Sequence, residues 1–284
     1  MSSGVRVAGA IGFPITHSLS PKLHRFWLDD LGIAGSYVPL AVRRENFSTV
    51  IQGLRSAGFT GVNVTVPHKQ AAFAIANTVD EAARKTGAAN LLVFEPEGTI
   101  HTRNTDVDGL CASLSEEIGS EKIKDKVAVV LGAGGAARAA VLTLDRLGVR
   151  EVRILNRNLA RAINLAAELK PHVRAKSVAL AWSEWNAAAT NTALLVNATS
   201  GGMAGAEPLD LRVDSLPSGA AVYDVVYNPL ETELVKQARR RGLLAANGLG
   251  MLMHQAAPAF ETFFSAKPQV TPALRAHLEA ALRS

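Results

Sequence analysis

The hydrophobic positions of this chain follow two periods in turn. Segments with alternating or continuous apolar residues, which favour strands, give way to segments whose apolar residues recur every three or four positions, which favour helices. In the N-terminal part, the predicted strands are residues 6–12, 36–42, 61–67, 88–95 and 98–104, and the predicted helices are 20–30, 45–58 and two short segments up to Gly87. Ser20 is predicted to be the N-cap of the first helix, with Pro21 at its first position. This alternation predicts an α/β fold.

The pattern resets near residue 125, which indicates a second domain. Residues 126–131 are continuously apolar, as expected for a strand of a parallel sheet that is covered on both faces. Further strands are predicted at 151–157, 192–200 and 220–228, with helices ending at Gly148 and spanning 158–170 and 231–241. This rhythm is typical of a doubly wound nucleotide-binding domain. The chain after Gly250 is predicted to be helical again, with Pro268 and Pro272 bracketing a final short helix.

The segment GVNVTVPHKQ, residues 61–70, has the alternation of a strand, with three valines on one face. Its other face carries Asn63 and Thr65, so it is either a half-exposed edge strand or one wall of a site. Polar residues also occur at other predicted strand ends and turns of the first domain, namely Ser18, Ser20, Lys69, Asn90, Thr105 and Asp106. We favour a site wall, because open α/β sheets bind ligands at their carboxyl edge, where Lys69 begins the next element.

Composition narrows the class of ligand. Hydrophobic residues make up 48% of the chain and charged residues 19%, which allows a sizeable core and argues against global disorder. The net charge of +5 comes from dispersed basic residues, and aromatic residues are only 5%, so we favour small anionic ligands over nucleic acid. The densest basic run, 239–241, lies at a predicted helix end, where cations suit the helix dipole.

The cysteine and histidine residues indicate which cellular compartment the protein suits and whether it binds a metal. The single cysteine, Cys111, cannot form an intramolecular disulfide, and it fits a reducing compartment. The first apolar run is too short for a signal peptide, and no stretch approaches the roughly 18 apolar residues of a membrane span. We therefore expect a cytoplasmic protein with no membrane partner. No metal is expected, because His17, His24, His68 and His254 lack ligand spacing with acids or thiols, and we expect these histidines to be solvated or to support a site from behind.

A glycine-rich motif opens the helix after the strand at 126–131. Its sequence fits G-x-G-x-x-A, and the candidate cofactor-binding residues are Gly132, Ala133, Gly134, Gly135 and Ala136. Gly132 permits the tight turn, Gly134 lets a pyrophosphate approach the backbone, and Ala137 lets helix and strand pack closely. The phosphates would then lie at the helix N-terminus, where backbone amides and the dipole favour anions.

The end of the next strand indicates which dinucleotide binds. NAD-binding domains place an acidic residue there to hold the ribose hydroxyls, but this chain has Asn156 and Arg157, with Arg161 one turn later. An arginine can stack on adenine and pair with a 2′-phosphate. The charge pattern therefore predicts NADP as the cofactor, bound by these three residues.

Nine short motifs, read together, resemble the shikimate dehydrogenase family nearly from end to end. They are SLSP (18–21), NVTVPHK (63–69), GAAN (87–90), NTD (104–106), GAGGAAR (132–138), NR (156–157), NATSGGM (197–203), YDVVYNP (223–229) and NGLGMLMHQA (247–256). The resemblance implies the reversible, NADPH-dependent reduction of 3-dehydroshikimate to shikimate in aromatic amino acid biosynthesis. Two positions depart from the family's pattern, Leu91 for a threonine after GAAN and Asn158 for a threonine after NR.

The resemblance also implies roles for individual residues. Lys69 matches the catalytic lysine that gives and takes the proton of the substrate oxygen, and Asp106 matches its acidic partner. Ser18, Ser20 and Tyr227 match residues that bind the substrate carboxylate, and Thr65, Asn90 and Gln255 match residues that bind the ring hydroxyls. Thr199, Val225 and Gly248 match positions that line the nicotinamide half of the cofactor, and Glu81 matches a weaker position on the cofactor side.

We expect two α/β domains around a cleft. The substrate domain spans residues 1–109 and is completed by the C-terminal helices 250–284, and the Rossmann-type NADP domain spans 110–249. One alternative is a quinate/shikimate dehydrogenase paralogue with another substrate or cofactor preference. An alternative of a different class is a non-catalytic NADP-sensing protein. A small-molecule substrate is the expected partner, and the protein is expected to be a monomer or a homodimer.

Overall fold

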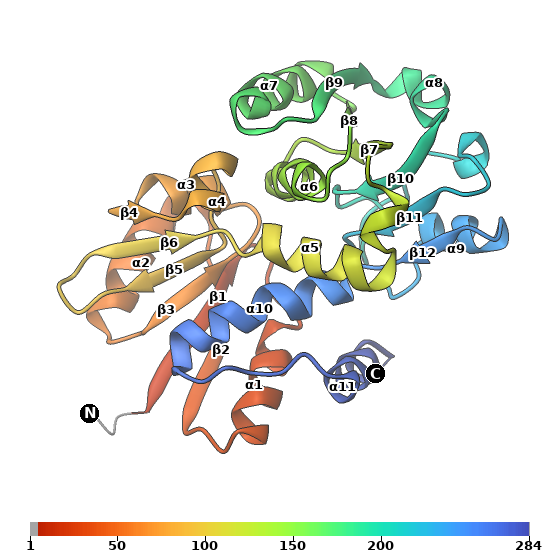
Figure 1. The fold of residues 1–284 in the computed structure, drawn as a ribbon. Coiled ribbons are helices and arrows are strands. Elements are labelled where there is room, and N and C mark those ends of the chain that lie inside the picture. The colour runs from red at the N-terminus through yellow and green to blue at the C-terminus, as the bar shows by residue number, and fades with distance from the viewer. Residues whose placement is uncertain (1–4, 284) are drawn as a thin grey trace. The chain divides into compact units, whose positions relative to one another are not determined.

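The computed structural model describes residues 5–283 as two compact units (Figure 1). The first unit comprises the described residues up to Asp106 together with Met253–Ala281. The second comprises Val107–Leu252 and the last residues of the chain. Two helices run from one unit into the other, α5 (Asp106–Glu117) and α10 (Leu249–Phe264).

The first unit contains a mixed sheet of six strands. They are β1 (Arg6–Gly12), β2 (Gly35–Ala41), β3 (Gly61–Val64), β4 (Thr78–Val79), β5 (Leu91–Phe94) and β6 (Ile100–Arg103), in the order β2-β1-β3-β5-β6-β4. Strand β1 pairs in parallel with β2 and β3, whereas β5 is antiparallel to β3 and β6. Residues 61–64 of the segment therefore form an interior strand and not an edge strand, with Val62 and Val64 buried, but the strand ends before Val66, which is 67% exposed.

The first unit also contains helices (Figure 1). They are α1 (Ser20–Asp30), α2 (Phe47–Ser56), α3 (Lys69–Ala74), α4 (Glu81–Thr86) and α11 (Pro272–Arg283), with a 3-10 turn η1 (Arg44–Asn46) before α2. The predicted N-cap at Ser20 is wrong, because α1 begins at Ser20 and its cap position is Leu19, which has no side-chain acceptor. The Ser18 hydroxyl accepts a hydrogen bond from the Ser20 amide at 3.3 Å instead. The prediction that Pro268 and Pro272 bracket the last helix is wrong, because α11 begins at Pro272 itself.

An aromatic cluster joins α1 to the C-terminal part of α10. The imidazole of His24 is fully buried and stacks on Tyr37, with ring centroids 3.8 Å apart. The rings of Trp27, Phe260 and Phe263 lie within 6.3 Å of it. His24 is therefore not solvated, and neither of its ring nitrogens has a hydrogen-bond partner among the described residues. The histidine faces inward because it lies beside Leu23, Trp27 and Leu28 on the buried face of α1.

The second unit contains a parallel sheet of six strands. They are β7 (Val127–Leu131), β8 (Glu151–Asn156), β9 (Lys176–Ala181), β10 (Thr192–Asn197), β11 (Ala221–Asp224) and β12 (Leu244–Ala246), in the order β12-β11-β10-β7-β8-β9. Counted from β7, this is the order 3-2-1-4-5-6 of doubly wound dinucleotide-binding domains, which confirms the predicted fold class. Strands β9 and β12 were not predicted, because no residue of β9 is fully buried and β12 has only three residues.

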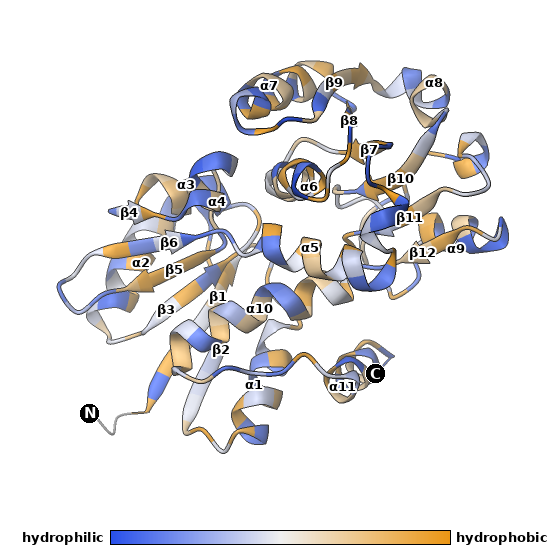
Figure 2. Ribbon diagram, in the orientation of Figure 1, coloured by the Kyte–Doolittle hydropathy of each residue, from blue (hydrophilic) through white to orange (hydrophobic). Residues whose placement is uncertain are grey.

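The helices of the second unit include α6 (Gly135–Arg146), α7 (Leu159–Leu169), α8 (Trp185–Ala189) and α9 (Glu233–Arg240), with 3-10 turns η2 (Ser120–Lys122), η3 (Lys170–His172), η4 (Trp182–Glu184) and η5 (Val213–Ser215). Helix α7 shows both hydrophilic and hydrophobic residues in Figure 2, and its Ala162, Leu165 and Leu169 are the buried ones. Strand β7 is buried along its whole length, as its continuous apolar pattern predicts.

The buried imidazole of His24 should make the stability of the first unit depend on pH. Burial lowers the pKa of His24 from 6.5 to about 3. The folded state accommodates only the neutral ring. The stabilisation of the folded state by this ring is therefore fully present above pH 6.5 and is lost as the pH falls from 6.5 toward 3. We expect a loss of about 2 kcal/mol in unfolding free energy from this group between pH 6.5 and pH 5.

Urea denaturation between pH 5 and pH 7.5 would measure this slope. The His24→Leu variant should show a flatter acid limb, whereas the exposed His17→Leu control should keep the slope of the parent. An unchanged slope in His24→Leu would mean that this imidazole does not govern the acid limb.

Candidate functional site

Lys69 and Asp106 form an ion pair in the first unit. Lys69 is the first residue of α3, just past the carboxyl end of β3, and Asp106 is the first residue of α5, just past β6. The Lys69 ammonium donates a hydrogen bond to the Asp106 carboxylate, and their side chains are 16% and 6% exposed. The carboxylate also lies at a helix N-terminus, which favours negative charge. The pair is thus nearly buried and has one face, that of the lysine, open to a ligand.

The turn before Lys69 is fixed by a buried histidine. The ring of His68 stacks on Phe47 with centroids 4.8 Å apart, and its Nε2 donates to the Val42 carbonyl at 2.7 Å. On the other side, the Lys69 carbonyl accepts from the Ala89 amide at 2.9 Å. His68 therefore supports the site from behind, and the start of α3 has little freedom to move.

A hydrogen-bonded group of side chains surrounds the Asp106 carboxylate. Asn90, which is 3% exposed, donates through Nδ2 to Asp106 Oδ1 at 2.9 Å and to Gln255 Oε1 at 3.1 Å. Its Oδ1 accepts from the Thr105 amide at 2.8 Å, and the Thr105 hydroxyl donates to the Gln255 carbonyl at 2.9 Å. Four sequence-predicted polar residues thus meet at one place: Asn90 just before β5, Thr105 just after β6, Asp106 at the start of α5, and Gln255 in α10.

Asn104 is a contributor to this group that sequence reasoning did not assign. Its Nδ2 donates to the Thr86 hydroxyl at 3.0 Å and to the Ala88 carbonyl at 2.9 Å, and its Oδ1 accepts from the Asp106 amide at 3.1 Å. It is 1% exposed. The NTD motif was visible in the sequence, but only the structure shows that its asparagine joins the loop after α4 to the start of α5.

The remaining predicted substrate residues of the first unit lie at the carboxyl ends of β1 and β3. Ser18, Ser20 and Thr65 are each partly exposed. Asn63 points into a hydrogen-bonded layer, since its Oδ1 accepts from the Tyr37 hydroxyl at 2.8 Å and its Nδ2 donates to the Asn90 carbonyl at 3.2 Å. Asn63 therefore supports Asn90 from β3. Burial raises the pKa of Tyr37 well above its usual value, and a hydrogen bond with Ser20 partly offsets this.

The glycine-rich turn of the second unit has the form that a dinucleotide needs. Gly132 has a φ of 108°, and a Cβ there would lie 3.0 Å from the Ala198 carbonyl oxygen, so a side chain is excluded. A Cβ on Gly134 would meet nothing within 4 Å, so the N-terminus of the 12-residue helix α6 is open to an approaching anion. Ala133, Gly135 and Ala136 complete the turn, as the motif predicts.

Arg157 and Arg161 lie on the exposed surface at the start of α7. The guanidinium carbon of Arg157 lies 5.9 Å from the centroid of the Trp182 ring. Asn156 donates through Nδ2 to the Asn158 carbonyl at 2.9 Å. Asn158 is the N-cap of α7 and makes no capping hydrogen bond through its side chain. The two arginines are thus four positions apart in sequence at the start of one helix, and both are exposed.

A buried carboxylate organises the loops after β10 and β11. Asp224 is fully buried and accepts hydrogen bonds from Asn197 Nδ2 at 2.8 Å, the Val226 amide at 3.0 Å and the Thr232 hydroxyl at 2.6 Å. Burial raises its pKa to about 6, although these hydrogen bonds act in the opposite direction. Asn197 in turn accepts through Oδ1 from the Thr199 amide and hydroxyl at 3.0 and 2.8 Å.

The backbone of these loops is closely packed. The Val225 amide donates to the Asn197 carbonyl at 2.9 Å, and the Gly248 amide donates to the Val226 carbonyl at 3.1 Å. A Cβ on Gly248 would lie 2.0 Å from the Val225 carbonyl oxygen. Thr199, Val225 and Gly248, which were predicted to line one half of a cofactor, therefore belong to neighbouring strand ends of one unit.

Two predicted residues lie apart from these groups. Glu81 is exposed at the start of α4 in the first unit and forms an ion pair with Lys85 at 2.6 Å. Tyr227 is partly buried in the loop that follows β11 in the second unit. Neither the ion pair of Glu81 nor the position of Tyr227 identifies a ligand.

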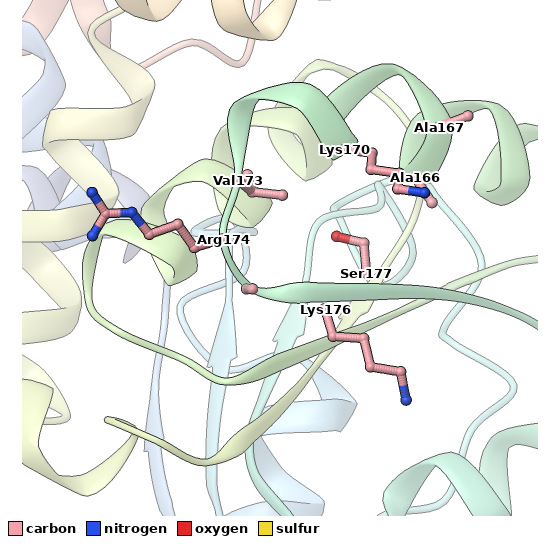
Figure 3. Close-up of a pocket in the computed structure, with 8 residues that line it drawn as sticks. Ala166, Ala167, Lys170, Val173, Arg174, Lys176 and Ser177 are labelled. Atoms are coloured by element: carbon pink, nitrogen blue, oxygen red, sulfur yellow. The ribbon is translucent and has the colours of Figure 1, made fainter.

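A surface hollow between the end of α7 and β9 is a weaker candidate for a site. Figure 3 shows Lys170, Arg174 and Lys176 at this hollow extending in three different directions. Ser177 has a buried hydroxyl without a hydrogen-bond partner among the described residues. Because the three cations do not converge, the hollow does not have the geometry of an anion site.

The described residues were searched for metal-binding clusters and for membrane-spanning helices. Within residues 5–283, no cluster of three or more histidine, cysteine, aspartate or glutamate side chains could hold a metal ion. In the same part of the chain, every helix is too short or too polar to cross a membrane.

Comparison with known proteins gives consistent matches over both units. The family model described as "Shikimate dehydrogenase substrate binding domain" matches residues 10–92, and the model described as "Shikimate / quinate 5-dehydrogenase" matches residues 113–204. An NADP(+)-dependent shikimate dehydrogenase of Methylobacterium radiotolerans is 50% identical over 284 residues, which cover 99% of either chain.

Solved structures share the whole fold. Shikimate 5-dehydrogenase from Thermus thermophilus, in complex with NADP(H) and shikimate, is 34% identical with a TM-score of 0.83, covering 98% of this chain and 99% of that one. Quinate dehydrogenase from Corynebacterium glutamicum, in complex with NAD, is 29% identical with a TM-score of 0.87, covering 99% of both chains.

Two glycine substitutions should separate folding from dinucleotide binding in the second unit. Gly248→Ala would place a methyl group against the Val225 backbone and should lower the unfolding free energy by about 2 kcal/mol or more. Gly134→Ala meets open space, so it should leave thermal stability within about 0.5 kcal/mol of the parent while weakening NADP binding at least tenfold. Thermal melts and titration calorimetry would measure both effects, and equal melting losses in the two variants would contradict this division.

Proposed function

The chain belongs to the shikimate dehydrogenase family, and we propose that Lys69 and Asp106 carry out the proton transfer of its reaction. The reaction is the reversible, NADP-dependent reduction of 3-dehydroshikimate to shikimate, a step in the biosynthesis of aromatic amino acids. The observation that supports these roles is the nearly buried ion pair of the two side chains, enclosed by hydrogen-bonded amides.

Each member of the pair has a different task. Reduction turns the carbonyl oxygen of the substrate into a hydroxyl, so a proton must reach that oxygen. NADPH supplies the hydride when it is bound. Lys69 gives the proton because its ammonium is the more exposed of the pair, and in the reverse direction its amine takes the proton back. Asp106 orients the ammonium, since its carboxylate is held by Asn90 and is nearly closed to solvent.

The hydrogen-bonded group around Asp106 suits a substrate with several hydroxyls. We assign Thr65, Asn90 and Gln255 to the ring hydroxyls, because Asn90 and Gln255 are joined by a hydrogen bond at 3.1 Å and offer both donors and acceptors. The hydroxyls of Ser18 and Ser20 are assigned to the carboxylate, with Tyr227 as a further donor from the second unit. A cleft between the two domains stays a prediction.

The second unit is assigned to the cofactor. The open turn at Gly132 and Gly134 suits the pyrophosphate, and Arg157 and Arg161 suit the 2′-phosphate because guanidinium groups pair with phosphate oxygens. Asn156 would contact the adenosine half. The loops held by Asp224 present Thr199, Val225 and Gly248 to the nicotinamide half, mostly through backbone groups. Glu81 is kept as a weaker position on the cofactor side.

The alternatives have less support. A quinate-acting paralogue would be related to the quinate dehydrogenase described above, but at 29% identity that protein is more distant than the shikimate dehydrogenase at 50%. A non-catalytic NADP sensor would have no need of the ion pair between Lys69 and Asp106. We also infer a cytoplasmic location from the biosynthetic reaction, and a monomer or homodimer stays a prediction.

An initial-rate panel tests the function directly. Shikimate and quinate would each be offered with NADP and with NAD, and we expect the highest kcat/KM for shikimate with NADP. Replacement of NADP by NAD should cost at least tenfold, because NAD lacks the phosphate that the two arginines would bind. Absence of turnover with shikimate would overturn the main assignment, and a preference for quinate would support the paralogue.

Removal of the lysine tests its role. Lys69→Ala should lower kcat by about 10²- to 10⁴-fold, because the substrate oxygen loses its proton donor, while NADP binding stays within about twofold. The exposed Lys267→Ala in the same unit is the matched control and should keep full activity. A thermal melt shows whether the variant is folded, and a folded Lys69→Ala with parental kcat would refute the catalytic role.

A further inference from the structure

Trp182 occupies a fixed position at the carboxyl edge of the cofactor sheet. It follows the last residue of β9 and begins η4. Its indole Nε1 donates to the Asp210 carbonyl at 3.2 Å, and its ring packs against the core cluster around Leu211 and Val213. The preceding residue is also tied down, because the Ala181 amide donates to the Glu184 carboxylate at 2.6 Å. The position of the indole is therefore fixed by the hydrogen bond along its edge, by its neighbours in sequence and by the hydrophobic core.

The sheet register brings Arg157 next to this ring. Strands β8 and β9 run in parallel with their last residues, Asn156 and Ala181, paired, so Arg157 and Trp182 are the first residues after the two strands. The guanidinium carbon lies over the indole at 5.9 Å from the ring centroid, within the range of a cation–π interaction. The contact thus follows from strand pairing and not from a chance meeting of surface side chains.

Contact with the Trp182 ring restrains the Arg157 guanidinium. Among residues 5–283, that side chain makes no hydrogen bond and no ion pair, so its N–H donors are available to a ligand. An exposed arginine that is free to rotate loses conformational entropy when it binds a phosphate. A flat aromatic surface beneath it reduces that loss without occupying any donor.

We propose that Trp182 is a positioning residue that holds Arg157 where the 2′-phosphate of NADP binds, and that it thereby contributes to the preference for NADP over NAD. This inference rests on the proposed cofactor role of Arg157. Trp182 acts through the arginine. The face of its ring that Arg157 covers carries no hydrogen-bond donor for the phosphate.

A double-mutant cycle tests the inference. Titration calorimetry would give the dissociation constants of NADP and NAD for the parent, Trp182→Leu, Trp182→Phe, Arg157→Ala and the Trp182→Leu/Arg157→Ala double variant. Trp182→Leu should lower the NADP preference by about two- to fivefold, the size expected of an exposed cation–π contact. Trp182→Phe should keep most of the preference, since a ring face remains. In the Arg157→Ala background, Trp182→Leu should change the preference no further.

Arg161 provides the matched control, because its guanidinium does not lie over the ring. Trp182→Leu should therefore still lower the preference in an Arg161→Ala background. An equal loss of NADP and NAD affinity in Trp182→Leu, or the same change of preference with and without Arg157, would overturn the inference and indicate a structural role. If Arg157→Ala itself leaves the preference unchanged, the inference is overturned together with the cofactor role of Arg157, whereas the assignment of the reaction still depends only on the rate panel.

Discussion

A charge that leaves water needs an opposite charge and a full set of hydrogen bonds, and this requirement explains much of the first unit. The carboxylate of Asp106 is 6% exposed, and it is compensated by Lys69 and Asn90. Asn90 needs its own partners, which come from Thr105 and Gln255, and the Asn90 backbone supports Asn63. Each polar residue is thus buried only because the next one satisfies it. The same arrangement holds the Lys69 ammonium, the more exposed member of the ion pair, in place.

The second unit solves a similar problem around Asp224. Its carboxylate is fully buried without a cation among the residues that hydrogen-bond to it, and three donors from Asn197, Val226 and Thr232 take that place. The cost of burial appears as a pKa raised to about 6. In return, the ends of β10 and β11 and the start of α9 are joined at one point, so the loops assigned to the nicotinamide half have a common anchor.

Sequence patterns predicted most of the strands, a doubly wound second domain and the motif residues, because period and turn chemistry are local properties, but they did not predict β4, β9 and β12. They failed where a residue's environment depends on distant segments. His24 was expected to be solvated or supporting, but residues of α10 bury it, more than 230 positions along the chain. Ser20 has the residue type of an N-cap, yet the helix begins one position earlier than that role requires. Asn104 belongs to a recognised motif and Trp182 to none, and the partners of both became apparent only from the strand pairing and the loop contacts.

The first unit is discontinuous in sequence, and this has a consequence for synthesis in the cell. Residues 253–281 supply Gln255 to the polar group, and Phe260 and Phe263 to the aromatic cluster around His24. The sheet that is translated first therefore cannot close its core or complete its site until residues 253–281 have left the ribosome. The second unit, which is nearly continuous, meets all its strands earlier. The chain therefore reverses the usual order of vectorial folding, and its N-terminal half must remain incomplete while the dinucleotide domain forms.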